Sequence, residues 1–199
     1  TDFIMTGFYD RNRNFEKTIS PSNEILISSN LERLLYELTG HDSQRVSQWM
    51  DELKKTGRYK VDELTRSQVQ EIFWSDYATY TETLESITAA WDKYHYLLDT
   101  HTAVALNVYE KYRQQTGDNS CTVIASTASP FKFGTSVARA ILSPELIKGK
   151  NEFELLETLA AETDKAIPEG IKNLNKREIR HKTVASAAKM EAVVLSSLI

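Results

Sequence analysis

The sequence has 199 residues, of which 41% are hydrophobic and 26% are charged, and its formal net charge is −4. This composition is typical of one soluble globular domain, and it lacks the basic cluster that nucleic acids or anionic membranes bind. No apolar run approaches the ~20 residues that span a bilayer, and no signal peptide is recognisable. We therefore expect a soluble protein with no nucleic-acid partner and no membrane partner.

Helical patterns dominate the first half of the chain. Residues 1–7 have the pattern of a short helix that ends at a glycine, and a second helix is predicted between Ser29 and Gly40. Ser29 and Glu32 have the spacing of a capping box in front of it. A third helix is predicted to end at Gly57. Its apolar stripe consists of Val46, Trp49, Met50 and Leu53.

Two more helices are predicted before residue 95. The first carries an aromatic stripe, and the second begins at Thr79 and Glu82, which again have the spacing of a capping box. We interpret the aromatic residues as core packing, because a surface that stacks bases needs interleaved basic residues. The two apolar faces consist of Val69, Ile72, Phe73 and Tyr77, and of Ile87, Ala90, Trp91 and Tyr94.

A polar stretch precedes the next predicted helix, which ends at Gly117. Thr100 or Thr102 is expected to cap this helix. His101 lies two residues after Asp99, and such a pair is either structural or a proton carrier. The sequence leaves the roles of both residues open.

The run from Thr122 to Ala125 is β-branched and apolar, which predicts a buried strand. Ser126 and Thr127 follow it, and a helix is predicted near Phe133. Ligands bind outside the carboxyl ends of strands in open α/β sheets, so these two hydroxyls are candidate site residues. The alternative is that they only form a turn or a cap.

Metal and disulfide chemistry are not indicated. Cys121 is the one cysteine and stands at the start of the predicted strand, where we expect a buried, unreactive thiol. A chain without an internal disulfide fits a reducing, cytoplasmic environment. The histidines show no metal-ligand spacing, and they are His41, His95, His101 and His181.

The remainder of the chain is predicted to be helical. One helix ends before Pro144, another begins at Asn151 and Glu154, a short one begins at Pro168, and a last amphipathic one follows Met190. The single convincing strand needs a hydrogen-bonding partner. It pairs either with residues 25–28 or with partners outside these 199 residues.

Three stretches share the motifs of one enzyme family. Residues 126–133, Ser-Thr-Ala-Ser-Pro-Phe-Lys-Phe, match the pattern Ser-Thr-Ala-x-Pro-x-Lys-Phe. Residues 20–22 and 28–33 match Ser-Pro-Ser followed by Ser-Asn-Phe/Leu-Glu-Arg. Residues 99–104 match Asp-Pro-His-Thr-Ala-Val, with Thr100 in place of the proline. In this order the stretches resemble threonine synthases, which are pyridoxal phosphate (PLP) enzymes of fold type II.

The resemblance implies a fold that is predominantly α with a few short strands, as the C-terminal fragment of an α/β fold type II enzyme of the tryptophan synthase β-like type. Residues 1–199 would be a single C-terminal portion of the large domain, without the N-terminal part that holds the cofactor lysine. The implied partners are O-phospho-L-homoserine and that missing part. The fragment would be inactive alone and would self-associate or dock through an exposed apolar face at residues 121–128.

The resemblance also implies site residues for the conversion of O-phospho-L-homoserine and water to L-threonine and phosphate. No catalytic residue is assigned, because the Ser-Phe-Lys-Asp motif with the Schiff-base lysine and the Gly-Asn-Phe-Gly-type phosphate loop are absent. Lys132 lies in a different motif, and its role is open. Thr127 is the candidate partner of the PLP pyridine nitrogen, supported by Ser126. The substrate-binding candidates are Ser22, Asn30 and Arg33.

Two alternative functions stay open at this point. One is a helical interaction module without chemistry, which predicts that Thr127 is buried and dry. The other is part of a different fold type II PLP lyase, against which the combination of all three motifs argues.

Overall fold

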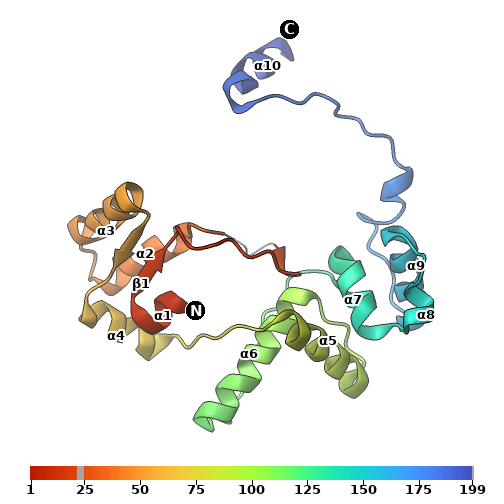
Figure 1. Cartoon of the computed structure of the whole chain (residues 1–199), viewed down its shortest axis with the longest axis horizontal. Helices are drawn as coiled ribbons and strands as arrows, with labels where there is room; N and C mark the ends of the chain where they lie inside the picture. The colour runs from red at the N-terminus through yellow and green to blue at the C-terminus, as the bar shows by residue number, and fades with distance from the viewer. Residues whose placement is uncertain (22–24, 199) are drawn as a thin grey trace. The chain divides into compact units, whose positions relative to one another are not determined.

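The computed structural model describes residues 1–21 and 25–198, and these form two compact units, residues 1–168 and 169–199 (Figure 1). The predicted fold class is confirmed, because helices dominate and the described residues contain a single two-stranded sheet. Its strands, β1 (Phe8–Asp10) and β2 (Arg58–Lys60), are antiparallel, with Tyr9 opposite Tyr59. In the described part of the chain, no helix is both long and apolar enough to cross a membrane.

The first cluster of helices surrounds this small sheet. It consists of α1 (Asp2–Thr6), α2 (Ser29–Leu38), α3 (Ser43–Thr56) and α4 (Glu63–Ile72). At its centre Tyr59 is buried, and its ring stacks on Tyr9 with the centroids 5.3 Å apart. This burial raises the pKa of the Tyr59 hydroxyl. The core side chains are Phe3, Leu35, Val46, Trp49, Leu53, Tyr59, Val61 and Val69.

Local signals at the ends of these helices are partly confirmed. Gly7 and Gly57 end α1 and α3 in the left-handed region, with φ of 69° and 81°, as the glycine pattern predicted. The capping box predicted at Ser29 is wrong. Ser29 is the first helical residue of α2, and the cap is Ser28, whose side chain makes no capping hydrogen bond.

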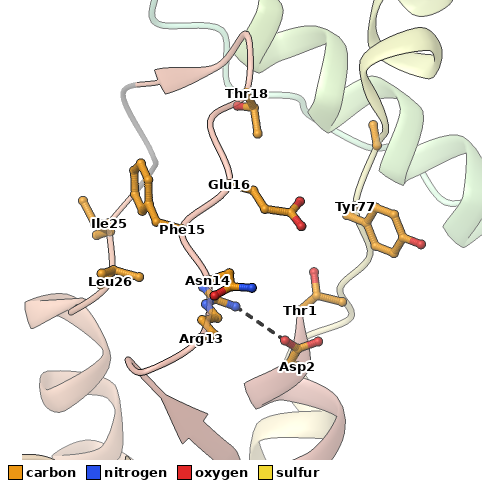
Figure 2. A pocket seen from close by; sticks show the side chains of 11 residues that line it. Thr1, Asp2, Arg13, Asn14, Phe15, Glu16, Thr18, Ile25, Leu26 and Tyr77 are labelled. Carbon is orange, nitrogen blue, oxygen red and sulfur yellow. Dashed lines mark hydrogen bonds and ion pairs between the residues drawn. The ribbon is translucent and has the colours of Figure 1, made fainter. Parts of the chain in front are cut away.

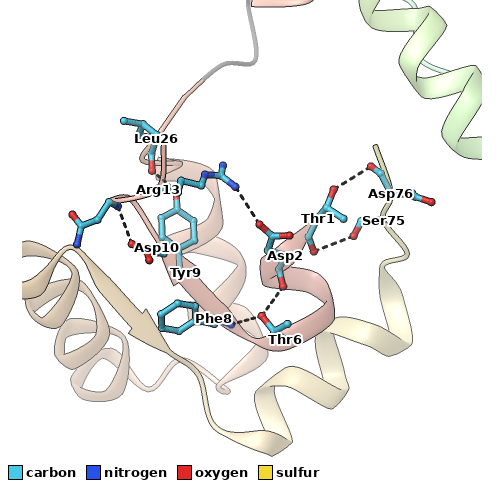
Figure 3. A network of polar contacts seen from close by, with 11 residues as sticks. Thr1, Asp2, Thr6, Phe8, Tyr9, Asp10, Arg13, Leu26, Ser75 and Asp76 are labelled. Atoms are coloured by element: carbon cyan, nitrogen blue, oxygen red, sulfur yellow. Dashed lines mark hydrogen bonds and ion pairs between the residues drawn. The ribbon is translucent and has the colours of Figure 1, made fainter. Parts of the chain in front are cut away.

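The segments that leave this cluster are fastened by side chains near the start of the chain (Figure 3). The Thr1 hydroxyl donates to the carbonyl of Asp76 at 3.1 Å, and the Ser75 hydroxyl donates to the carbonyl of Thr1 at 3.3 Å. The Tyr9 hydroxyl donates to the carbonyl of Leu26 at 3.0 Å. Residues 73–79 and the segment that precedes α2 are therefore both held against the first helical cluster.

The second group of helices begins with α5 (Tyr80–Tyr94) and α6 (Thr100–Thr116). It continues with α7 (Gly134–Ile141), α8 (Pro144–Ile147) and α9 (Glu152–Thr163). Helix α5 packs against α6 and α7, and α7 packs against α9. The capping boxes predicted at Thr79 and Asn151 are both confirmed. A Cβ atom at Gly134 would collide with Leu156, so glycine permits the close approach of α7 and α9.

Residues 169–198 contain the helix α10 (Met190–Ser196), as predicted, and two short 3₁₀ turns, Leu174–Lys176 and Ala187–Lys189. The helix predicted from Pro168 is wrong, because turns and the first 3₁₀ segment take its place. The apolar face of α10 is exposed, and Met190 retains 59% of its accessible surface.

The predicted buried strand at residues 121–125 is absent. This stretch has no strand pairing, and its pairing with residues 25–28 is not formed either. Val123 is 91% exposed, and Cys121 is an exposed free thiol rather than a buried one. The prediction of local burial failed because a strand is buried by its neighbours, and the described residues supply none. The exposed apolar face expected for a fragment is present.

The aromatic stripe assigned to the core is also largely exposed. Val69 is 1% exposed and belongs to the first core, but Ile72, Phe73 and Tyr77 are 63%, 41% and 64% exposed. Helix α4 ends at Ile72, so the residues after it no longer follow a helical face. The helix period predicted their burial only on the assumption that the helix continued.

An ion pair between α5 and α6 gives a prediction about pH. Lys111 Nζ lies 2.8 Å from Glu82 Oε1, and the hydrogen bonds from Lys111 and Thr79 lower the pKa of Glu82 from 4.5 to about 2. Because the folded pKa is depressed, the stabilisation is present above pH 4.5 and is lost as the pH falls towards 2. We expect Lys111→Met to flatten the dependence of the melting temperature on pH in this range. The control is Lys55→Met, which we expect to keep the wild-type dependence on pH. If the melting temperatures of both variants depend on pH in the same way, the ion pair is not the source of this dependence.

Candidate functional site

The first turn of α6 is capped by a buried carboxylate. Asp99 is 1% exposed and accepts hydrogen bonds from the backbone N–H groups of His101 at 2.8 Å and Thr102 at 3.3 Å. The prediction that Thr100 or Thr102 caps this helix is therefore wrong. A carboxylate suits the position better than a hydroxyl, because the helix N-terminus carries a partial positive charge.

Ser126 is connected to this cap. The Thr102 hydroxyl hydrogen-bonds to Oδ2 of Asp99, and Oγ of Ser126 lies 3.0 Å from Oγ1 of Thr102. Thr127, the next residue, is exposed, and its hydroxyl has no hydrogen-bond partner among the described residues. The structure thus holds Ser126 in place and leaves the Thr127 hydroxyl available to a ligand.

His101 lies beside the same cap. Its Nδ1 is 3.3 Å from Oδ1 of Asp99 without forming a hydrogen bond, and both ring nitrogens lack a hydrogen-bond partner within the described residues. Its ring packs on Phe133, with the centroids 4.7 Å apart. The neighbouring Lys132 is exposed, with Nζ 5.5 Å from the Phe133 centroid. The stretch 126–133 therefore contacts the start of α6 near both of its ends.

The segment before α2 reaches the same place. The Ser20 hydroxyl donates to the carbonyl of Thr100 at 3.3 Å. All three motif stretches consequently meet at the N-terminus of α6, although they are separated by up to about a hundred residues in the sequence.

The substrate-binding candidates do not gather in the same way. Ser22 lies outside the described residues. Asn30 and Arg33 are both exposed on α2, where the Arg33 guanidinium hydrogen-bonds to the side-chain oxygen of Asn30. Within the described part of the chain, neither of them forms a hydrogen bond or ion pair with the start of α6.

Two hollows adjoin the segment that carries Ser20. One has a volume of about 780 Å³ and is lined by residues 16–20, residues 76–80, Thr83, His101 and Val104. Lys17 is a charged lining residue that sequence reasoning missed. The available signal was its position three residues before Ser20, in front of the first motif.

The second hollow, of about 660 Å³, shares four lining residues with the first, Glu16, Thr18, Tyr77 and Ala78. Figure 2 shows Glu16 extending from its segment towards Tyr77 and Thr1 on the opposite side. An ion pair of 3.5 Å between Arg13 and Asp2 joins the two sides at the lower end of this view. No cluster of three or more His, Cys, Asp or Glu side chains suited to a metal ion occurs in the described residues.

Comparison with known families places these motifs in context. Residues 102–194 match the family model described as threonine synthase, C-terminal. The chain is 35% identical over 148 residues to threonine synthase-like 1 of Macaca fascicularis. This alignment covers 73% of this chain and 19% of that protein. It is 35% identical over 153 residues to threonine synthase of Saccharomyces cerevisiae, covering 70% of this chain and 30% of the yeast protein.

Solved structures agree with the sequence matches. The crystal structure of threonine synthase from yeast superposes with a TM-score of 0.77 at 29% identity and covers 98% of this chain and 39% of that one. The PLP-bound threonine synthase from Brucella melitensis superposes with a TM-score of 0.64 at 32% identity and covers 78% of this chain and 32% of that one. The chain thus spans between about a fifth and two fifths of the lengths of these relatives. The family model, the relatives and the solved structures thus all support the predicted resemblance to the C-terminal portion of threonine synthase.

Proposed function

We propose that this chain is the C-terminal part of a PLP-dependent threonine synthase, which converts O-phospho-L-homoserine and water to L-threonine and phosphate. The observation that supports this most directly is the meeting of three motif stretches at the N-terminus of α6, through Ser20, Asp99 and Ser126. A helical interaction module would bury Thr127, whereas Thr127 is exposed.

The residues present fit one part of PLP, its pyridine nitrogen. Thr127 offers an exposed hydroxyl without a partner in the described residues, and the neighbouring Ser126 is tethered to α6. A carboxylate beside the ring nitrogen would keep that nitrogen protonated. A neutral hydroxyl forms a hydrogen bond with the nitrogen without keeping a proton on it. When bound, PLP supplies an electron sink for negative charge on the substrate carbon. In this proposal Thr127 contacts the nitrogen and Ser126 supports it.

We assign the substrate side to Ser22, Asn30 and Arg33. The first turn of α2 has no capping side chain, so its backbone N–H groups are available to an anion. The Arg33 guanidinium is exposed at the start of the next turn and can bind a phosphate with two parallel hydrogen bonds. These groups suit the phosphate of O-phospho-L-homoserine.

The proposed organisation treats residues 1–199 as a single portion of the large domain, with the lysine that binds PLP outside them. Its support is that the matched relatives are much longer than this chain. These residues alone are then inactive. The exposed free thiol of Cys121 suits the reducing cytoplasm, where we place the enzyme.

Phosphate release from O-phospho-L-homoserine tests the proposal. We expect release by the whole protein encoded by the gene with PLP added, and none by residues 1–199. Release by residues 1–199 alone would contradict the assignment of the lysine to another segment. No release by the whole protein would contradict the proposed reaction.

Replacing Thr127 tests the cofactor contact separately. We expect Thr127→Val in the whole protein to weaken PLP binding about 10-fold, since one hydrogen bond to the ring is lost. Absorbance titration with PLP measures this affinity. The matched control is Thr122→Val, an equal change in the same segment, at a residue whose hydroxyl bonds only to the nearby carbonyl of Ser120. Wild-type affinity in Thr127→Val would exclude Thr127 as the partner of the nitrogen.

A further inference from the structure

We infer that Asp99 is a positioning residue for the cofactor side of the site, acting through Thr102 on Ser126 and so on Thr127. The inference rests on the proposed function, in which Thr127 contacts PLP. It assigns a role to a carboxylate that touches neither cofactor nor substrate in that proposal.

The first step is that, among the described residues, the segment carrying Thr127 has one hydrogen bond to another element. Residues 121–128 make no backbone hydrogen bond within the described part of the chain, and the Thr122 hydroxyl bonds only to the local carbonyl of Ser120. The remaining hydrogen bond joins Ser126 to Thr102 at 3.0 Å. This contact therefore fixes the position at which the segment passes the start of α6.

The second step is that Asp99 sets the direction of the Thr102 hydroxyl. A threonine side chain on a helix divides between two rotamers, because its hydroxyl can also bond to a carbonyl of the preceding turn. The carboxylate accepts only, so Thr102 donates its proton to Oδ2 and keeps its lone pairs for the Ser126 hydroxyl. Asp99 and Thr102 are 1% and 5% exposed, so water cannot replace the hydrogen bond between them.

The third step concerns Thr127. Its peptide bond is shared with Ser126, so holding the Ser126 side chain restricts the position of the Thr127 hydroxyl, which is otherwise exposed. A ligand-binding hydroxyl that is restricted before binding loses less conformational freedom when the ligand arrives. The contacts that run from the buried Asp99 and Thr102 to the exposed Ser126 thus preorganise the Thr127 hydroxyl.

The test uses Thr102, because loss of the buried Asp99 also threatens folding. Thr102→Val keeps the side-chain shape and removes the hydroxyl that links Asp99 to Ser126, whereas Thr102→Ser keeps that hydroxyl. The matched control is Thr163→Val in α9, a residue that is 4% exposed and whose hydroxyl bonds to the carbonyl of Leu159 in its own helix. Each of the three variants is measured at a temperature that lies equally far below its own melting temperature.

The first readout is the ¹H–¹⁵N heteronuclear NOE of Ser126 and Thr127 in the 199-residue chain without cofactor. We expect it to fall in Thr102→Val towards the value for Val123, and to stay at the wild-type value in Thr102→Ser and Thr163→Val. An unchanged NOE in Thr102→Val would overturn the inference.

The second readout is the affinity of the whole protein for PLP, which we expect to fall about 10-fold in Thr102→Val and to recover in Thr102→Ser. If the NOE falls while the PLP affinity is unchanged, the tether stands and the proposed contact of Thr127 with PLP fails. If the NOE and the affinity are both unchanged, the positioning role of Asp99 fails and the proposed function is untouched.

Discussion

Replacing Val123 with aspartate is expected to leave the stability of the 199-residue chain unchanged and to destabilise the whole protein severely. Val123 is 91% exposed, so the new carboxylate stays in water in this chain. The surrounding run is β-branched and has the composition of a buried strand, but no strand pairs with it in the described residues. We propose that the segment preceding these residues in the whole protein supplies that pairing.

The surface next to Val123 supports this proposal. A hollow of about 630 Å³ lies between residues 122–125, the end of α4 and one face of α6. Its lining is rich in apolar and aromatic side chains, among them Ile72, Phe73, Trp74, Tyr109 and Tyr112. Contiguous apolar surface of this kind marks an interaction site. The matched yeast structure is much longer than this chain, which covers 39% of it, so that structure contains residues beyond the matched part.

The expected magnitude follows from the burial of a charge. A carboxylate without a partner in a packed sheet destabilises a protein by about 3–5 kcal/mol, whereas exposed substitutions stay within about 0.5 kcal/mol. Urea unfolding of the 199-residue chain and of the whole protein measures both quantities. The matched control is Val184→Asp, since Val184 is 95% exposed and lies in the other compact unit.

Two outcomes would contradict the docking proposal. In one, Val123→Asp leaves the whole protein as stable as the wild type. In the other, sedimentation shows that the 199-residue chain dimerises and that Val123→Asp abolishes the dimer while sparing the whole protein, which would assign this face to self-association.

The sequence predicted those features that depend on a few neighbouring residues. The capping boxes at Thr79 and Asn151 and the glycine after α3 are encoded within one helical turn, and all three formed. The capping box at Ser29 failed because the helix starts one residue earlier than its leucine pattern suggested. A shift of one residue is enough to move a capping side chain into the helix.

Features that depend on distant residues were not predictable in the same way. Strands β1 and β2 have three residues each and pair Tyr9 with Tyr59 across fifty positions, so neither carries a detectable period. The link between Ser126 and Thr102 likewise depends on how two segments approach in space. The motifs predicted which residues belong to the site, and the folded chain showed which of these candidates are in contact.

Removing the Asp99 side chain is expected to be among the most destabilising single changes in this chain. Its carboxylate caps α6 through two backbone N–H groups and also accepts from the Thr102 hydroxyl, all at 1% exposure. Losing an N-cap destabilises a protein by about 1 kcal/mol, and leaving buried donors unpaired adds about 1–3 kcal/mol. We therefore expect Asp99→Ala to lower the free energy of unfolding by about 3 kcal/mol.

The matched comparison is Thr79→Ala, which removes the exposed cap of the neighbouring helix α5. Water can replace that hydroxyl, so we expect a loss of about 1 kcal/mol, measured by urea unfolding under the same conditions. We expect the loss for Asp99→Asn to lie between these two values. The amide oxygen of asparagine still accepts hydrogen bonds, but its NH₂ group faces hydrogen-bond donors. If Asp99→Ala and Thr79→Ala lower the free energy of unfolding equally, burial adds nothing to the cap. Asp99 would then be an ordinary N-cap rather than the residue that joins the three motifs.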